Sequence, residues 1–262
     1  MHHLRHPAVI APLLGALLSL AATHCGDDST GRTRITVDAV VRGAGAVRTS
    51  STGWQITLTE ARIALGPLRW YEGAALFGRT FFDRLLGVSV AYAHPGHYVA
   101  GEALADITAR RVVDLLRPDG TPLPQGNGVT GLAQSAAIEL RPAEGSLADA
   151  ASLRGGTLYV SGSATKDGRT VRFDCAPVLT QAVQGIPARG DMNQSGRWDI
   201  TVDIGAWIDR ADFSTIPSPA DPDAVVTLTE GQAFNAVTRT APAASGFTFV
   251  WTAAAAADSG AR

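Results

Sequence analysis

Two histidines are the residues of this chain whose type and spacing point most directly to chemistry. The 262-residue sequence holds six histidines, four of them within the first 24 residues, and the other two are His94 and His97. Pro95 and Gly96 separate them in the string AYAHPGHY. Because proline fixes one backbone angle and glycine permits a reversal, this turn can point both imidazoles at one ion. Neutral imidazole is a good ligand for copper, zinc and nickel ions, so we predict a transition-metal site, copper before zinc.

Two imidazoles do not complete a metal site, and further donors must come from elsewhere in the chain. The spacing of the sequence selects none of the remaining candidates, which are Glu72, Glu102, Asp106 and Met192. The alternative for His94 and His97 is a structural role, in which they cap a turn and hydrogen-bond backbone carbonyls.

A second candidate metal site is the string DMNQSGRWD, residues 191–199. Its oxygen-bearing side chains resemble the first part of a calcium loop, with Gly196 at the sixth position. Val202 stands where such a loop places a bidentate glutamate. The alternative is an ordinary polar turn that leads into a strand. The predicted calcium ligands are Asp191, Asn193, Ser195 and Asp199.

The beginning of the chain predicts export from the cell. A basic start and an uncharged apolar run over residues 8–22 have the layout of a signal peptide, and the run is too short to span a bilayer. Cys25 lies just past this run, and the junction resembles a bacterial lipobox, with His24 and Ala22 where a small residue and a leucine are usual. The resemblance implies that Cys25 is acylated and anchors the protein to a membrane. Gly26 then favours the outer membrane.

The alternative at this junction is cleavage by the ordinary signal peptidase after residue 21 or 22. The product would be a soluble periplasmic protein, and a disulfide between Cys25 and Cys175 would become possible in that oxidising compartment. Without it, we expect Cys175 to be a free thiol in a partly buried place. We therefore divide the chain into a signal peptide (1–24), a tether (25–33), one domain (34–252) and a low-complexity tail (253–262).

The elements that must position these residues alternate with period two. Short runs in which every second residue is apolar are typical of half-buried strands, and turn residues separate them. Asp167 and Gly168 mark a hairpin turn between two such runs. We predict an all-β fold, an antiparallel β-sandwich with long embellished loops and one or two short helices. The clearest runs are residues 35–41, 54–65, 138–140, 158–160, 171–173, 200–204 and 247–251.

Four segments depart from this pattern. Residues 74–92 form an irregular apolar cluster, which suggests a folded insertion or a short helix on the sheet. Residues 102–116 fit either a helix or a strand, and residues 207–210 suggest a helical turn. The string GNGVTG, residues 126–131, matches a dinucleotide-binding fingerprint, but it follows two prolines instead of a strand, so we expect a flexible loop.

Aromatic side chains offer a further, minor hypothesis of a sugar-stacking face. Most of them lie in alternating runs, where packing in the core is the default. These residues are Trp54, Trp70, Tyr71, Trp198, Trp207 and Trp251.

Charge and motifs exclude several functional classes. A net charge of −2 and an isoelectric point near 6.3 create no field that would gather nucleic acid. The sequence lacks a zinc-protease helix, a nucleophile elbow and a phosphate-binding loop, and no spacing selects a pair of catalytic carboxylates. We expect a protein that is not an enzyme.

Taken together, the strand at residues 54–71, the histidine loop, the string at 198–203 and Trp207 resemble a known group of proteins. They are similar to exported copper-binding β-sandwich proteins associated with methanobactin operons, and to Gram-negative lipoproteins with a His-Pro-Gly-His loop. The resemblance implies a non-catalytic cell-envelope protein that binds a metal ion through His94 and His97. The alternative is a metal-free structural or interaction lipoprotein whose protein partner the sequence does not name.

Overall fold

The computed structural model describes residues 31–75, 100–217, 221 and 223–255, and the structural statements below concern these residues. The chain divides into two units, residues 1–32 and 33–262. The fold described here is that of the second unit, in which the described strands belong to one large sheet.

The strands are β1 (Arg34–Ala44), β2 (Val47–Thr49), β3 (Gln55–Tyr71), β4 (Ala103–Ile107), β5 (Arg111–Asp114), β6 (Thr121–Pro122), β7 (Gly126–Val129), β8 (Gly131–Leu140), β9 (Leu158–Lys166), β10 (Arg169–Cys175), β11 (Gln181–Met192), β12 (Gly196–Asp203), β13 (Val225–Thr227) and β14 (Phe247–Ala253). The helices are α2 (Ile204–Ile208) and α3 (Gly231–Thr240), and the 3-10 helices are η1 (Ala150–Leu153) and η2 (Ala244–Gly246).

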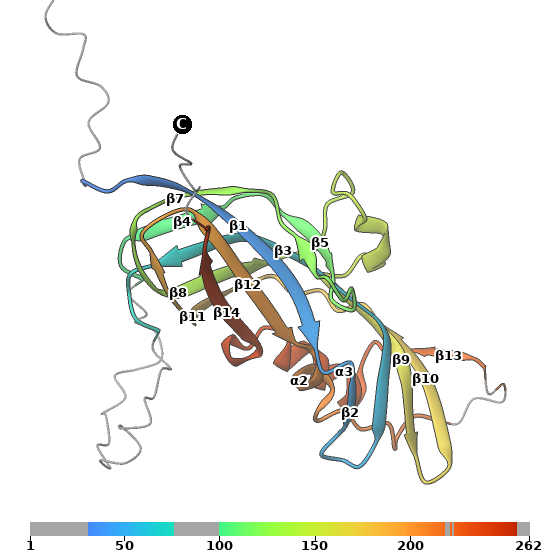
Figure 1. Cartoon of the computed structure of the whole chain (residues 1–262). Helices are drawn as coiled ribbons and strands as arrows, with labels where there is room; N and C mark the ends of the chain where they lie inside the picture. The colour runs from blue at the N-terminus through green and yellow to red at the C-terminus, as the bar shows by residue number, and fades with distance from the viewer. Residues whose placement is uncertain (1–30, 76–99, 218–220, 222, 256–262) are drawn as a thin grey trace, which may run out of the picture. The chain divides into compact units, whose positions relative to one another are not determined.

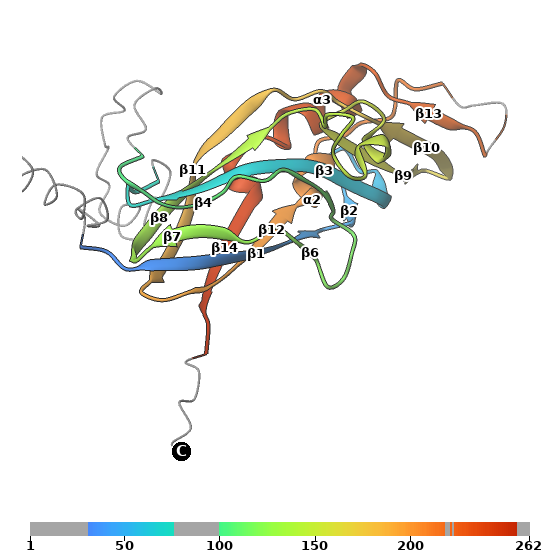
Figure 2. The same cartoon turned by 90° about the horizontal axis from the view of Figure 1, so that it is seen from above.

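The sheet curves back on itself and encloses the core between two layers. Its main path runs β13-β10-β9-β3-β4-β7-β1-β12-β14. Strand β8 also pairs with β3, and β11 pairs with β8. Strands β8 and β11 therefore face β1, β12 and β14 across the core, as Figures 1 and 2 show. Strands β11 and β14 pack together without forming a ladder in the described residues, so the sheet stays open along this seam.

Large aromatic side chains fill the space between the layers. Trp70 of β3 stacks on Trp198 of β12 with ring centroids 5.6 Å apart, and Phe249 of β14 meets both rings edge-on. Near α2, Trp54 packs against Phe213 at 5.4 Å. Trp54, Trp70, Trp198 and Trp207 are all buried, which confirms their interpretation as core residues.

The prediction of an all-β, sandwich-like fold is confirmed, but the sheet is mixed and not purely antiparallel. Strand β1 pairs in parallel with β12, and β10 pairs in parallel with β13. The alternation of apolar residues shows which face of a strand is buried and carries no information about its direction. The predicted hairpin is confirmed, since Lys166 pairs with Arg169 and both turn residues, Asp167 and Gly168, have positive φ.

The uncertain segments resolve in different ways. Residues 102–116 form the two strands β4 and β5, not a helix. The helical turn expected at 207–210 begins earlier, as α2, because the Asp203 carboxylate accepts a hydrogen bond from the Ala206 N–H at 3.0 Å. Helix α3 was not predicted. Most of the apolar cluster at 74–92 and most of the tail at 253–262 lie outside the described residues.

The expectation of a flexible loop at residues 126–131 is wrong. Gly126–Val129 form strand β7, which pairs with both β1 and β4, and β8 begins at Gly131. The glycines allow β7 to approach β4 closely. A Cβ atom on Gly126 would overlap the Asp106 carbonyl oxygen, and one on Gly128 would lie 2.8 Å from the Ala105 Cβ. Glycine thus serves backbone packing here, in a segment whose composition is typical of a loop.

The Asp212 carboxylate connects the core residue Trp54 with the chain at Ser214. Asp212 accepts hydrogen bonds from the Ser214 hydroxyl at 2.6 Å, from the Ser214 N–H at 2.9 Å and from the Trp54 indole N–H at 3.0 Å. The hydrogen bonds from Ser214, and to a lesser extent the one from Trp54, lower the pKa of Asp212 below its ordinary value. The ionised form of this carboxyl therefore stabilises the fold.

We predict that Gly126→Ala lowers the free energy of unfolding by about 1–3 kcal/mol, because a methyl group at this position overlaps the backbone of β4. Gly145→Ala is the matched control, since nothing lies within 4 Å of a Cβ at that site. It should change stability by less than about 0.5 kcal/mol. Urea unfolding followed by tryptophan fluorescence measures both values, and equal losses in the two variants would contradict the close approach of β7 and β4.

We predict that Asp212→Asn reduces the acid sensitivity of the fold. A carboxyl with a lowered folded-state pKa contributes stability above its unfolded-state pKa, and this contribution is lost as pH falls through the folded-state value. The amide keeps an acceptor for Trp54 and does not titrate. Between about pH 5 and pH 2, unfolding free energies should therefore fall more steeply in the wild type than in the variant. Parallel curves would refute the stabilising role of the ionised carboxyl.

Candidate functional site

The histidine loop leaves the fold at the end of β3 and returns at the start of β4. His94 and His97 lie outside the described residues, and the structure describes the chain on both sides of the loop. The Glu72 N–H donates to the Glu102 carbonyl at 3.1 Å, and the Gly73 N–H donates to the Ala100 carbonyl at 2.8 Å. These two bonds extend the pairing of β3 with β4 and hold the two ends of the loop side by side. We call residues 72–73 and 100–102 the loop base.

Strand β8 supports the loop base from the other edge of β3. The Gln134 side-chain amide donates to the Glu72 carbonyl at 2.6 Å, and the Ser135 hydroxyl donates to the Gly73 carbonyl. Gly101 has a φ of +71°, and a Cβ there would lie 2.9 Å from the Gly73 nitrogen. The loop base thus depends on a glycine in the left-handed region and on side chains from a third strand.

The structure separates the four candidate donors that accompany the histidines. Glu72 and Glu102 belong to the loop base. Met192 ends β11 and is fully buried in the core. Asp106 lies on β4, beyond the loop base. The glutamates are therefore the predicted donors that the structure places where the histidine segment begins and ends.

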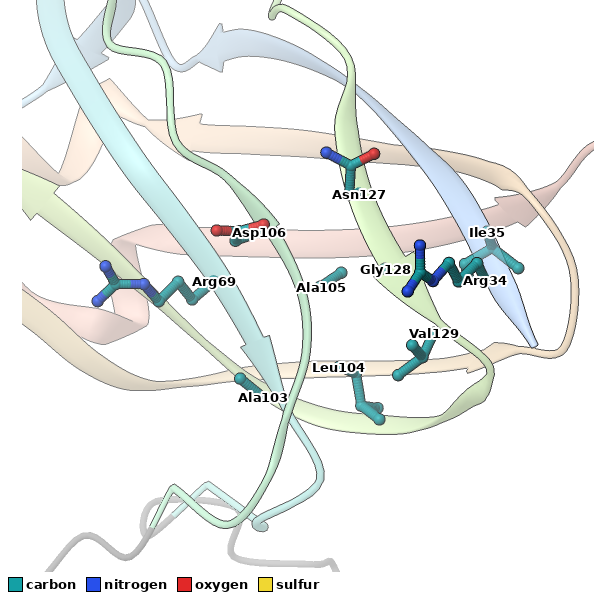
Figure 3. A pocket seen from close by; sticks show the side chains of 10 residues that line it. All are labelled: Arg34, Ile35, Arg69, Ala103, Leu104, Ala105, Asp106, Asn127, Gly128 and Val129. Atoms are coloured by element: carbon teal, nitrogen blue, oxygen red, sulfur yellow. The ribbon is translucent and has the colours of Figure 1, made fainter. Parts of the chain in front are cut away.

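Asp106 belongs to a shallow groove of about 390 Å³ across β1, β3, β4 and β7. It stands opposite Arg69 of β3 on one side and Asn127 of β7 on the other. Figure 3 shows these polar side chains and Arg34 together with the apolar residues that line the groove. The neighbours of Asp106 across the sheet are thus a cation and an amide and not further metal donors.

The four residues of the predicted calcium loop occupy the turn between β11 and β12 and its flanks. The Ser195 hydroxyl accepts hydrogen bonds from the Thr36 N–H at 3.0 Å and from the Thr36 hydroxyl at 3.1 Å. Asp199 forms ion pairs with Arg42 at 2.9 Å and Arg197 at 3.1 Å. Asp191 and Asn193 are exposed.

Two of the predicted calcium ligands therefore already have partners within the protein, an arrangement that suits the alternative of a polar turn leading into a strand. Among the residues that the structure describes, no three His, Cys, Asp or Glu side chains gather as a metal site would require. Calcium binding stays a prediction.

Cys175 is a buried free thiol among the described residues, and Cys25 lies outside them. Burial, with a smaller contribution from the charge of Asp174, raises the pKa of Cys175 to about 12. The thiol is therefore protonated at neutral pH and behaves as a small apolar side chain.

Sequence reasoning missed a polar cluster on the outer face of β9 and β10, in which Tyr159 and Asp174 are buried and Arg154 is exposed. Arg154 Nη1 lies 2.6 Å from Asp174 Oδ2, and the Tyr159 hydroxyl lies 3.4 Å from the same oxygen. The Arg154 guanidinium covers the Tyr159 ring at 4.5 Å from its centroid. Burial, and then the charge of Asp174, raise the pKa of Tyr159 above its ordinary value. We call Arg154, Tyr159 and Asp174 the Asp174 cluster.

Alternation along β10 does place Asp174 on the outer face of the sheet, together with Arg172. Its burial comes from the segment around η1, whose approach has no signal in the local sequence.

No helix within the described ranges is both long and apolar enough to cross a bilayer.

No protein-family model and no curated protein matches this sequence. Among solved structures, the chain is similar to MbnP from Methylosinus trichosporium, with 11% sequence identity and a TM-score of 0.40. The alignment covers 85% of this chain and 99% of that one. A likeness this distant carries no argument about fold or activity. We therefore build the proposed function on residues of this chain.

We predict that Gly101→Ala loosens the loop base. The substitution places a side chain in the left-handed region, which costs about 1–2 kcal/mol, and also brings a Cβ against the Gly73 nitrogen. Gly155→Ala is the matched control, because Gly155 has a φ of +83° and open space around it. Amide hydrogen exchange at Gly73 should accelerate in Gly101→Ala and not in Gly155→Ala. The same protection at Gly73 in both variants would count against this role of Gly101.

Proposed function

We propose that this chain is an exported, lipid-anchored protein of the cell envelope that binds a transition metal ion through His94 and His97 without catalysing a reaction. One observation supports this proposal most directly. The segment with both histidines is joined to the sheet at a base in which hydrogen bonds hold its ends together. A loop closed at its base loses less conformational entropy when a ligand orders it than a free segment would.

The types of donor atom at this place fit copper or zinc. Imidazole nitrogens suit both ions, and Glu72 and Glu102 provide carboxylates at the loop base. Among divalent ions, copper binds a given set of nitrogen and oxygen ligands more tightly than zinc, so we propose copper first. The role would be storage or delivery of the ion.

The proposed location depends on the leader sequence. The signal peptide supports export, and Cys25 followed by Gly26 supports an acylated protein of the outer membrane. If Cys25 is not acylated, the same domain is a soluble periplasmic protein. Metal binding by the domain is independent of this choice.

We predict that the chain from Gly26 onward, which includes the whole compact unit 33–262, binds one copper ion with higher affinity than zinc. Calorimetric titration with an independent measurement of metal content tests this. Binding should disappear in the double variant His94→Ala/His97→Ala. The variant Glu72→Gln/Glu102→Gln should weaken binding by roughly 10-fold or more if these carboxylates bind or orient the ion.

The matched control for the histidines is Asp191→Asn/Asp199→Asn, which changes the other candidate metal site. It should leave copper binding unchanged. Copper binding that is indifferent to both histidines would refute the proposed site, and no binding of either ion would favour the metal-free interaction lipoprotein.

A further inference from the structure

The turn between β11 and β12 holds a motif that the proposed function does not use. Asp191, Asn193 and Ser195 are three of the predicted calcium ligands, and the same spacing fits another chemistry. An asparagine followed two residues later by serine or threonine, with a residue other than proline between them, is the acceptor motif of N-linked glycosylation. Residues 193–195 read Asn-Gln-Ser and match this motif.

One asparagine of this chain meets the rule. The sequence contains three, Asn127, Asn193 and Asn235, and a valine stands two positions after the first and the third. Bacterial oligosaccharyltransferases, which transfer a glycan outside the cytoplasm, also select an acidic residue two positions before the asparagine. Asp191 occupies this position. The motif is thus complete in the form that suits an exported bacterial protein.

Asn193 has the exposure that an acceptor needs. Residues 193–195 form bends between the two strands, and Asp191 and Asn193 are both exposed. Neither side chain has a hydrogen bond or an ion pair in the part of the chain that the structure describes. An N-linked glycan is bulky and requires a surface position. A glycan on Asn193 Nδ2 therefore breaks no contact of the described fold.

The residues that follow Asn193 are held by neighbouring strands. The Ser195 hydroxyl accepts hydrogen bonds from the N–H and the hydroxyl of Thr36 on β1, at 3.0 and 3.1 Å. The Ser195 carbonyl accepts one at 2.9 Å from the N–H of Ala254, which directly follows β14. The Gln194 side-chain amide donates to the Ala254 carbonyl. The asparagine side chain thus stays outside a turn whose next two residues are fixed.

These contacts determine when a glycan can be attached. The transferase must bind the serine hydroxyl together with the asparagine, but in the folded protein that hydroxyl lies against Thr36. Thr36 precedes Ser195 by 159 residues, so the contact forms when β1 and β12 pair during folding. A chain that is still unfolded presents Ser195 freely. The inference therefore rests on the export that the proposed function includes.

We propose that Asn193 is an N-glycosylation site, modified by an oligosaccharyltransferase before the exported chain folds. The donor is an oligosaccharide linked to a polyprenyl pyrophosphate. Asn193 Nδ2 forms a bond to C1 of the first sugar, and the bond between C1 and the pyrophosphate oxygen breaks. The pyrophosphate leaves with the electron pair of that bond, and a base takes one proton from the amide nitrogen. The step involves no oxidation or reduction.

The test expresses the full chain in bacteria that carry an oligosaccharyltransferase of this class and a lipid-linked oligosaccharide of known mass. One form keeps its own leader, and a second form has an established signal peptide in place of residues 1–24. Glycopeptide mass spectrometry of protein recovered from the cell envelope measures the occupancy of each asparagine. We expect the glycan at Asn193 and none at Asn127 or Asn235.

Variants at each position of the motif sharpen the result. Asn193→Gln and Ser195→Ala should lose the glycan, and Asp191→Asn should lose most of it. Ser195→Thr keeps a hydroxyl at the required position and should keep the glycan. Asn127→Gln is the matched control, because it makes the same change at an exposed asparagine outside the motif. Its occupancy at Asn193 should equal that of the wild type.

Two results would overturn the proposal in cells that modify a known acceptor protein. One is an unmodified Asn193 in the form with the established signal peptide, and the other is a glycan that survives in Ser195→Ala. Modification of that form alone would support the site and count against the export signal of the proposed function. Copper titration does not depend on Asn193, so it tests the metal site separately.

Discussion

The pairing of β3 along both of its edges is the constraint on which the rest of the structure depends. This strand is 17 residues long. Strands β9 and β8 follow one another along one edge, and β2, β5 and β4 follow one another along the other. Its inward side chains, such as Ile56, Ile63 and Trp70, contribute to the main core. A shift of β3 by one residue would turn these side chains outward, so its register is strongly determined.

The two proposed sites depend on this strand to different degrees. Its last residues continue into the loop base, so the two hydrogen bonds of the loop base begin where the ladder of β3 with β4 stops. The turn at Asn193 lies between β11 and β12, where β1 and the residue after β14 hold it. The two sites thus differ in construction. One is a long loop closed at its base, and the other is a short turn fixed by its neighbours.

Sequence reasoning succeeded where the information is local. Alternation predicted the strands with Ile35, Ile56 and Phe247, and a two-residue turn predicted the hairpin at Asp167. It failed where geometry depends on segments far apart in the chain. The parallel pairing of β1 with β12 has no local signal. The glycine-rich composition of β7 is typical of a loop. These glycines instead allow the close approach of β7 to the backbone of β4, and the local sequence gives no sign of that contact. Helix α3, which begins at Gly231, was missed for another reason: its buried Ala233, Ala236 and Val237 recur at helical spacing, and the search for alternating runs passed over them.

The candidate sites divide in the same way. His94 and His97 were selected by elimination, because the other four histidines all lie within the first 24 residues. The choice of Glu72 and Glu102 over Met192 required the structure, since it depends on which side chains lie in the core. Asp174 looks like any outward-facing acid of a strand. Asp174 differs from such residues because it is paired with Arg154, which is twenty residues away in sequence.

The open seam between β11 and β14 bears on how copies of this protein behave toward one another. An unpaired strand edge is a template on which another chain can add a strand. In β11, Pro187 has no N–H to offer, and the pairing with β8 slips on both sides of it, between Val183 and Ile186 and between Pro187 and Gly190. Such irregular, proline-containing strands are poor templates for a continuous ladder. On its β11 side, the open seam is thus a poor template for another chain.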